Sequence, residues 1–248
     1  TERVPIIDAS GNVEYSYRYS KLNEKTDVPI KLTNGYIVFR YLPKGNYVLI
    51  ETEAPEGYDL PVGSSAETTF EVSETTTESD IEVIKNKPSK IILKKYSEDG
   101  LLLSGARFKL YKVNKDNYDV NLSIKNNALL HGEVLTLKTI RDGEYEYKNE
   151  KDTDIITTCI KDCSLIGKET GDAGTIESGM LQVEYLDTEN YYIFEEIEAP
   201  KGYKLPENPY TLVYLPESVD GETTNIEIEN INDGINKSQD YINTIKSV

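Results

Sequence analysis

Apolar and polar residues alternate over short stretches along most of the chain. This period-two pattern marks residues 36–41, 47–51, 68–72 and 225–229, with Gly, Pro, Asn and Asp between such stretches. Alternation predicts β-strands, because successive side chains of a strand point to opposite faces of the sheet. Short strands at this spacing are typical of a sandwich, and no segment carries a sustained helical stripe. The pattern therefore predicts an all-β protein.

One motif occurs twice. Residues 47–61 read YVLIETEAPEGYDLP and residues 192–206 read YIFEEIEAPKGYKLP, with nine identical positions. The copies are offset by 145 residues, which is about the length of one domain. We therefore expect two tandem β-sandwich domains, over residues 1–88 and 89–232, that meet near Pro88, because proline cannot continue a strand ladder.

The two copies differ in length. Residues 113–167 have no counterpart in the first copy and are expected to form extra hairpins or a long excursion between early strands. Residues 1–8 align best with a segment that follows the first strand of the second copy, so the first domain is expected to lack its own first strand. Residues 233–248 are expected to be a tail or the start of a following strand, since YINTIKSV alternates.

Each copy carries a Glu and an Asn at a similar separation. Glu51 and Asn86 lie 35 residues apart, and Glu196 and Asn230 lie 34 residues apart. Asn230 ends the run TNIEIEN, in which it shares a strand face with two isoleucines. We therefore expect this amide to point into the core.

A lysine near the start of the second copy is also predicted to point inward. Lys95 alternates with Ile91 and Leu93, whereas Lys94 falls on the outer face. Burial favours the uncharged forms of both an amine and a carboxyl group, and the uncharged amine is a nucleophile. A protonated Glu beside it can polarise the Asn carbonyl and supply the proton with which ammonia leaves. The pattern predicts an amide bond between two side chains.

These motifs resemble a known family. The runs ETEAPEGY (51–58), EIEAPKGY (196–203) and KKYSEDGLLLSGARFKLYK (94–112) resemble the Cna protein B-type domains of Gram-positive collagen adhesins and sortase-assembled pilins. The resemblance implies immunoglobulin-like, transthyretin-like sandwiches and an intramolecular Lys–Asn isopeptide bond between the first and last strands of a domain; in the first copy, which lacks the expected first strand with its lysine, whether such a bond forms is left open.

The resemblance also implies roles for the residues singled out above. In the second copy Lys95 is the donor, Glu196 the catalyst and Asn230 the acceptor. In the first copy Glu51 is the catalyst and Asn86 the acceptor, and the partner lysine is unknown.

Composition excludes several classes of partner and site. The net charge of −17 repels nucleic acid and anionic lipid headgroups, and no apolar run is long enough to span a membrane. No nucleophile–His–Asp pattern or phosphate-binding loop occurs, so an enzyme with a diffusible substrate and a cofactor are not expected. Cys159 and Cys163 lack the further ligands that a zinc site needs, because His131 is the only histidine in the sequence. A local disulfide, which needs a turn between the cysteines, and two free thiols both remain open.

The sequence thus predicts a non-enzymatic stalk module, extracellular at the cell wall of a Gram-positive bacterium, in an adhesin or a pilin. Its partners would be neighbouring domains or subunits. The alternative is an adhesin module in which residues 113–167 contact a host extracellular protein; an exposed apolar patch there would favour it.

Overall fold

The protein is mostly β. The computed structural model describes residues 38–75, 86–97, 99–147, 151–161, 163 and 177–217, together with the backbone of strands at 2–7, 13–18 and 224–230. Fifteen strands and one α-helix lie in these ranges, which confirms the predicted fold class. By contacts, the chain divides into two compact units: Thr1–Ile50 with Glu67–Val83, and Glu51–Ala66 with Ile84–Val248. The repeat-based domain boundaries stay a prediction.

The first unit contains a small sheet and a strand pair. In the sheet, β1 (Glu2–Ile7) pairs antiparallel with β2 (Val13–Arg18), which pairs parallel with β3 (Phe39–Arg40). β4 (Gly45–Ile50) and β5 (Glu67–Val72) are antiparallel, and the rings of Tyr47 and Phe70 stack across them at 5.2 Å. Cross-strand aromatic pairs of this kind stabilise a strand pair.

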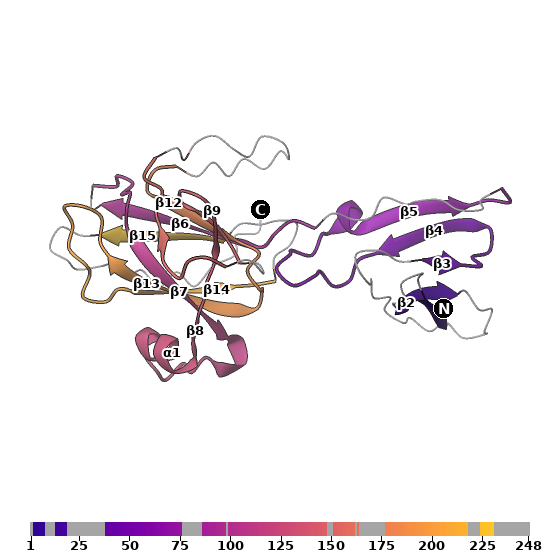
Figure 1. The fold of residues 1–248 in the computed structure, drawn as a ribbon, viewed down its shortest axis with the longest axis horizontal. Helices are drawn as coiled ribbons and strands as arrows, with labels where there is room; N and C mark the ends of the chain where they lie inside the picture. Colours follow the sequence, from indigo (N-terminus) through magenta and orange to yellow (C-terminus); the bar gives the residue numbers. More distant parts are fainter. Residues whose placement is uncertain are drawn as a thin grey trace. The chain divides into compact units, whose positions relative to one another are not determined.

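The second unit is a two-sheet sandwich (Figure 1). One sheet has the order β15-β6-β12-β10-β9 and the other the order β11-β7-β13-β14, with β8 paired to β7. The first sheet comprises β15 (Thr224–Asn230), β6 (Lys90–Ser97), β12 (Met180–Glu184), β10 (Glu144–Glu146) and β9 (Lys138–Arg141). The second comprises β11 (Ile156–Thr157), β7 (Arg107–Asn114), β13 (Asn190–Glu198), β14 (Tyr210–Leu215) and β8 (Glu133–Val134).

The core of this sandwich is built by inward-facing apolar residues of both sheets. Leu93 and Leu181 come from one sheet, and Phe108 and Phe194 from the other; all four are 0% exposed. The two phenylalanine rings meet edge to face, with centroids 6.2 Å apart, a favourable aromatic geometry. The alternation read from the sequence is therefore the alternation that fills the core.

In the described part of residues 113–167, one element is not predicted by periodicity. After the short 3-10 turn η2 (Lys115–Asn117), the helix α1 (Ile124–His131) lies beside β7, and β8 to β11 follow (Figure 1). Its N-terminus is capped by Ser123, whose hydroxyl accepts a hydrogen bond from the Asn126 N–H. The predicted tail, residues 233–248, lies outside the described residues.

Candidate functional site

A buried lysine lies at the centre of the second unit. Lys95 is 0% exposed and lies within β6, a strand in which most residues are buried. It occupies the inner face of β6 together with Ile91 and Leu93, whereas the adjacent Lys94 is partly exposed. A buried ammonium without a partner would be strongly unfavourable, so this position requires a neighbouring acceptor.

That acceptor is Glu196 of the facing sheet. It follows Tyr192 and Phe194 on the inner face of β13 and is 2% exposed. The pairing of β13 with β7 shifts register between Glu196 and Glu198. Such bulges redirect side chains and are frequent at functional sites. The bulge and the facing sheets together bring the carboxylate to the amine.

The two side chains form a buried ion pair. The Lys95 Nζ lies 2.6 Å from the Glu196 Oε2. Burial lowers the pKa of Lys95 below its ordinary value, and the charge and hydrogen bond of Glu196 act against this lowering. The pair can exchange a proton over one hydrogen bond, which gives a neutral amine and a neutral acid. The arrangement is therefore suited to an amine nucleophile with an adjacent general acid.

The backbone of Asn230 lies beside the same strand. β15 runs parallel to β6, with Ile228 opposite Lys95 and Asn230 opposite Ser97. Asn230 is thus two register positions from Lys95, and positions two apart share a strand face. The side chain of Asn230 lies outside the described residues.

The predicted acid and amide of the first copy are also in contact. The Asn86 Nδ2 donates to the Glu51 Oε1 at 2.9 Å and approaches the backbone carbonyl of Asp59 at 3.3 Å. Both residues are half-buried and both belong to the second compact unit. Lys21, Lys25 and Lys31, which match no part of the motif, lie outside the described residues.

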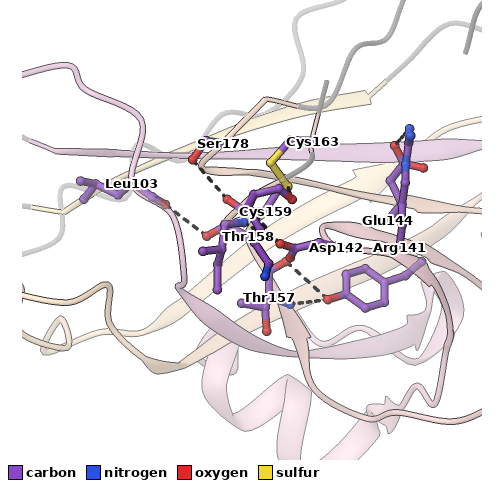
Figure 2. Close-up of a disulfide and its surroundings, with 12 residues drawn as sticks. Leu103, Arg141, Asp142, Glu144, Thr157, Thr158, Cys159, Cys163 and Ser178 are labelled. Atoms are coloured by element: carbon purple, nitrogen blue, oxygen red, sulfur yellow. Dashed lines mark hydrogen bonds and ion pairs between the residues drawn. A yellow bond between two sulfur atoms is a disulfide. The ribbon is translucent and has the colours of Figure 1, made fainter. Parts of the chain in front are cut away.

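Cys159 and Cys163 form a disulfide, with their Cα atoms 6.0 Å apart (Figure 2). They are 0% and 6% exposed and pack with Ile92 and Met180. Cα atoms this close at a sequence separation of 4 require the chain to turn between the cysteines. The Asp142 Oδ2 accepts hydrogen bonds from the Ile160 and Lys161 N–H groups of this turn, at 3.1 and 3.0 Å. No local sequence signal points to this carboxylate, because Asp142 is 17 residues from Cys159.

Within the described ranges, no group of three or more His, Cys, Asp or Glu side chains is placed to hold a metal ion. No helix in the described part of the chain has the length and apolar character needed to cross a membrane.

Comparison with known proteins identifies the fold of one part of the chain. Residues 8–87 match the family model described as SpaA, prealbumin-like fold domain. No curated protein matches the chain. Among solved structures, a streptococcal ancillary pilin is similar at 23% identity and a TM-score of 0.40, with 77% of this chain and 46% of that chain covered.

Two further pilins are similar at lower identity. A minor pilin of Streptococcus agalactiae is 20% identical, with a TM-score of 0.37 and coverage of 78% and 63% of the two chains. The shaft pilin SpaA of Lactobacillus rhamnosus GG is 16% identical, with a TM-score of 0.37 and coverage of 93% and 70%. The chain thus spans about half to two thirds of the length of these pilins. The transthyretin-like fold predicted from the motifs agrees with the prealbumin-like family match of residues 8–87.

Proposed function

We propose that this chain is a structural stalk module of a cell-wall-anchored Gram-positive surface protein, an adhesin stalk or a pilin. Its second unit is held by an autocatalytic isopeptide bond between Lys95 and Asn230. The observation that carries the proposal is the buried contact of 2.6 Å between Lys95 and Glu196, beside the strand that ends in Asn230. A buried ion pair adds little net stability by itself, so a chemical role accounts better for its presence.

The reaction needs no group from outside the chain. A proton passes from the Lys95 ammonium to the Glu196 carboxylate, and the neutral Nζ attacks the Asn230 side-chain carbonyl carbon. The bond between that carbon and the amide nitrogen breaks as Glu196 delivers the proton to this nitrogen, so that ammonia leaves. The attacking nitrogen still carries one proton too many, and it passes this proton to the Glu196 carboxylate, which leaves a neutral amide and a protonated Glu196. One amide replaces another and one ammonia is released, once per chain. Because the folded core holds both reactants in place, proximity supplies much of the rate.

A covalent link between β6 and β15 suits a load-bearing role. The two strands are parallel neighbours in one sheet, and a bond between them carries tension past the sandwich, which then need not unzip. The partners of such a module are the neighbouring domains or subunits of the same surface protein. The disulfide between Cys159 and Cys163 supports an extracellular location, because such bonds persist in oxidising compartments.

The decisive measurement is the intact mass of the folded chain. We expect a deficit of one ammonia relative to the sequence mass, and a full mass in Lys95→Ala and in Asn230→Ala. Lys94→Ala is the matched control and is expected to keep the deficit. A deficit of two would assign a second bond to the Glu51–Asn86 pair, and an undiminished mass would refute the cross-link while leaving the fold intact.

A second candidate function is contact with a host extracellular protein through residues 113–167. The segment around α1 exposes apolar side chains: Val120 is 82%, Leu129 56% and Leu130 68% exposed. Tyr118 stacks on Tyr191, with centroids 4.2 Å apart, and both pack in one cluster with Ala128 of the helix. Exposed apolar and aromatic groups close together are typical of protein-binding surfaces.

Substitution of the exposed leucines tests this candidate. The double variant Leu129→Ser/Leu130→Ser should keep a free energy of unfolding within about 0.5 kcal/mol of wild type, because both side chains are exposed. If the surface binds, adhesion of protein-coated beads to host extracellular matrix should fall at least about tenfold. Leu101, which is 65% exposed and lies outside residues 113–167, supplies the control Leu101→Ser. Equal adhesion by all three proteins would exclude the surface as the binding site.

A further inference from the structure

The disulfide-closed turn, of which the structure describes residues 159–161 and 163, stands at one end of a hydrogen-bonded path that leads to Lys95. The Gly179 N–H donates to the Cys159 carbonyl at 2.9 Å, and the Lys95 N–H donates to the Gly179 carbonyl at 3.0 Å. The Cys159 N–H in turn donates to the Met180 carbonyl at 2.7 Å. The backbone N–H of Lys95 is therefore two hydrogen bonds away from a disulfide-bonded residue.

A second path starts at Thr158, the residue before Cys159, and reaches the backbone carbonyl of Lys95. The Thr158 hydroxyl donates to the Leu103 carbonyl at 3.1 Å (Figure 2). The Leu103 N–H donates to the Lys95 carbonyl at 2.7 Å. Thr158 is 0% exposed. Both backbone hydrogen-bonding groups of Lys95 are thus held by residues that are themselves bonded to the segment entering the turn.

The paths leave little room for adjustment. Gly179 has φ +89°, and a Cβ added there would lie 2.7 Å from the Leu103 nitrogen. Gly143 has φ +82°, and a Cβ there would lie 2.6 Å from the Cys159 Cβ. The two glycines allow the turn, β12 and the Leu103 segment to approach closely. A displacement of the turn is therefore passed on to its neighbours, since packed interiors have few voids to absorb it.

We propose that the disulfide-closed turn is a positioning element for the cross-linking reaction: it holds the backbone of Lys95 where the Nζ meets Glu196 and the acceptor amide. This inference rests on the proposed isopeptide chemistry. The disulfide itself does not react. Its closure fixes Cys159 and Thr158, and through the two paths it limits the movement of Lys95. Attack on a carbonyl depends steeply on the placement of the two atoms, so freeing the turn should slow the bond without abolishing it.

The test follows the intact mass of newly synthesised chains in an oxidising cell-free reaction. In Cys159→Ala/Cys163→Ala we expect ammonia loss to slow at least about tenfold and still to reach completion, because displacements near 1 Å can cost about a hundredfold. Wild-type chains made with a phosphine reductant should slow in the same way. Asp142→Ala removes the acceptor for Ile160 and Lys161 but keeps the disulfide, and should have a smaller effect in the same direction.

Loss of stability alone must be separated from loss of positioning. Ile193 is fully buried in a different cluster on the outer side of the β13 sheet. Ile193→Val and Ile193→Ala provide controls with a smaller and a larger loss of stability. The control whose unfolding midpoint matches that of the cysteine variant is the one whose rate of ammonia loss is compared with it. Faster hydrogen exchange of the Lys95 amide in the cysteine variant, and not in that control, is a second expected result.

The outcomes separate the two claims. If wild-type chains keep their full mass, the proposed cross-link fails. If wild-type chains lose ammonia and the cysteine variant does so as fast as the stability-matched control, the cross-link stands and the positioning role is overturned. A slower reaction than the control, together with faster exchange at Lys95, supports the positioning role.

Discussion

Replacement of Lys95 by Met should lower the free energy of unfolding of the second unit by at least about 5 kcal/mol. The proposed bond between Lys95 and Asn230 closes a loop of 135 residues. By the loop-entropy relation used for disulfides, opening a loop of that length costs about 5 kcal/mol. Met fills a similar volume without a charge, so a cavity contributes little. The measurement is a guanidinium titration of wild type and variant.

The single substitution has a second effect that a double substitution removes. With Lys95 replaced, the buried Glu196 loses the hydrogen bond that the Lys95 nitrogen donates, and the loss of a partner by a buried polar group costs about 1–3 kcal/mol. In Lys95→Met/Glu196→Met both polar groups are replaced by apolar side chains, an exchange that is often neutral or stabilising. We therefore expect the double variant to recover the cost of the lost hydrogen bond and to retain the deficit of about 5 kcal/mol from the open loop.

Two further variants fix the interpretation. Lys94→Met changes the adjacent, partly exposed lysine and should unfold within about 0.5 kcal/mol of wild type. Asn230→Ala keeps Lys95 and Glu196 and removes the acceptor, so it should lose the loop-closure stabilisation. If Asn230→Ala and wild type unfold at the same guanidinium concentration, no covalent loop contributes to stability.

The sequence is most informative where strand alternation and the repeat coincide. Alternation along β6 is enough to place Lys95 with Ile91 and Leu93 inside the sandwich, and the repeat singles out Glu196 from its neighbours. Both inferences use local geometry, since the direction of a strand side chain depends only on its position in the pleat. Alternation does not predict that the side chains of Lys95 and Glu196 meet across the facing sheets, because this contact depends on how the sheets pack.

The helix α1 shows why local patterns fail in the inserted segment. Its buried positions are Asn127 and Ala128, whereas Leu129 and Leu130 are exposed. Asn127 is satisfied by the backbone around Asp119, whose N–H donates to its Oδ1 and whose carbonyl accepts from its Nδ2 at 2.9 Å. An apolar stripe is the usual sign of a packed helix, and here a polar side chain takes the buried place. The Ser123 cap is the one local signal that marks this helix.

The network behind Lys95 is also invisible in the sequence. Its links join residues that are far apart along the chain, such as Lys95 with Gly179 and Asp142 with Lys161. Apart from the Thr158 hydroxyl, each donor is a backbone N–H bonded to a backbone or carboxylate oxygen, so residue identity carries little information about these links. The exceptions are Gly143 and Gly179, where a positive φ and close approach require glycine. A glycine in the sequence, however, does not reveal which segment it allows to come near.

Replacement of Glu196 by Gln should slow ammonia loss roughly 100- to 10,000-fold, the usual contribution of a positioned general acid–base group. Gln retains the size of the side chain and an oxygen that can accept from the Lys95 Nζ, but it cannot take up and return a proton. The measurement is the intact mass of newly synthesised chains over time. Glu195→Gln is the matched control: Glu195 accepts hydrogen bonds from Tyr111 and Tyr210, at 2.7 Å each, and not from Lys95.

The direction of the Lys95 pKa makes this comparison decisive. Burial lowers the pKa of Lys95, and Glu196 acts to raise it. Removal of the carboxylate should therefore lower this pKa further and increase the fraction of neutral amine at a given pH. If the neutral amine were all that the reaction needs, Glu196→Gln would react as fast as wild type or faster. A slower reaction at every pH, with the Glu195→Gln control unchanged, assigns to Glu196 the transfer of the proton to the departing ammonia.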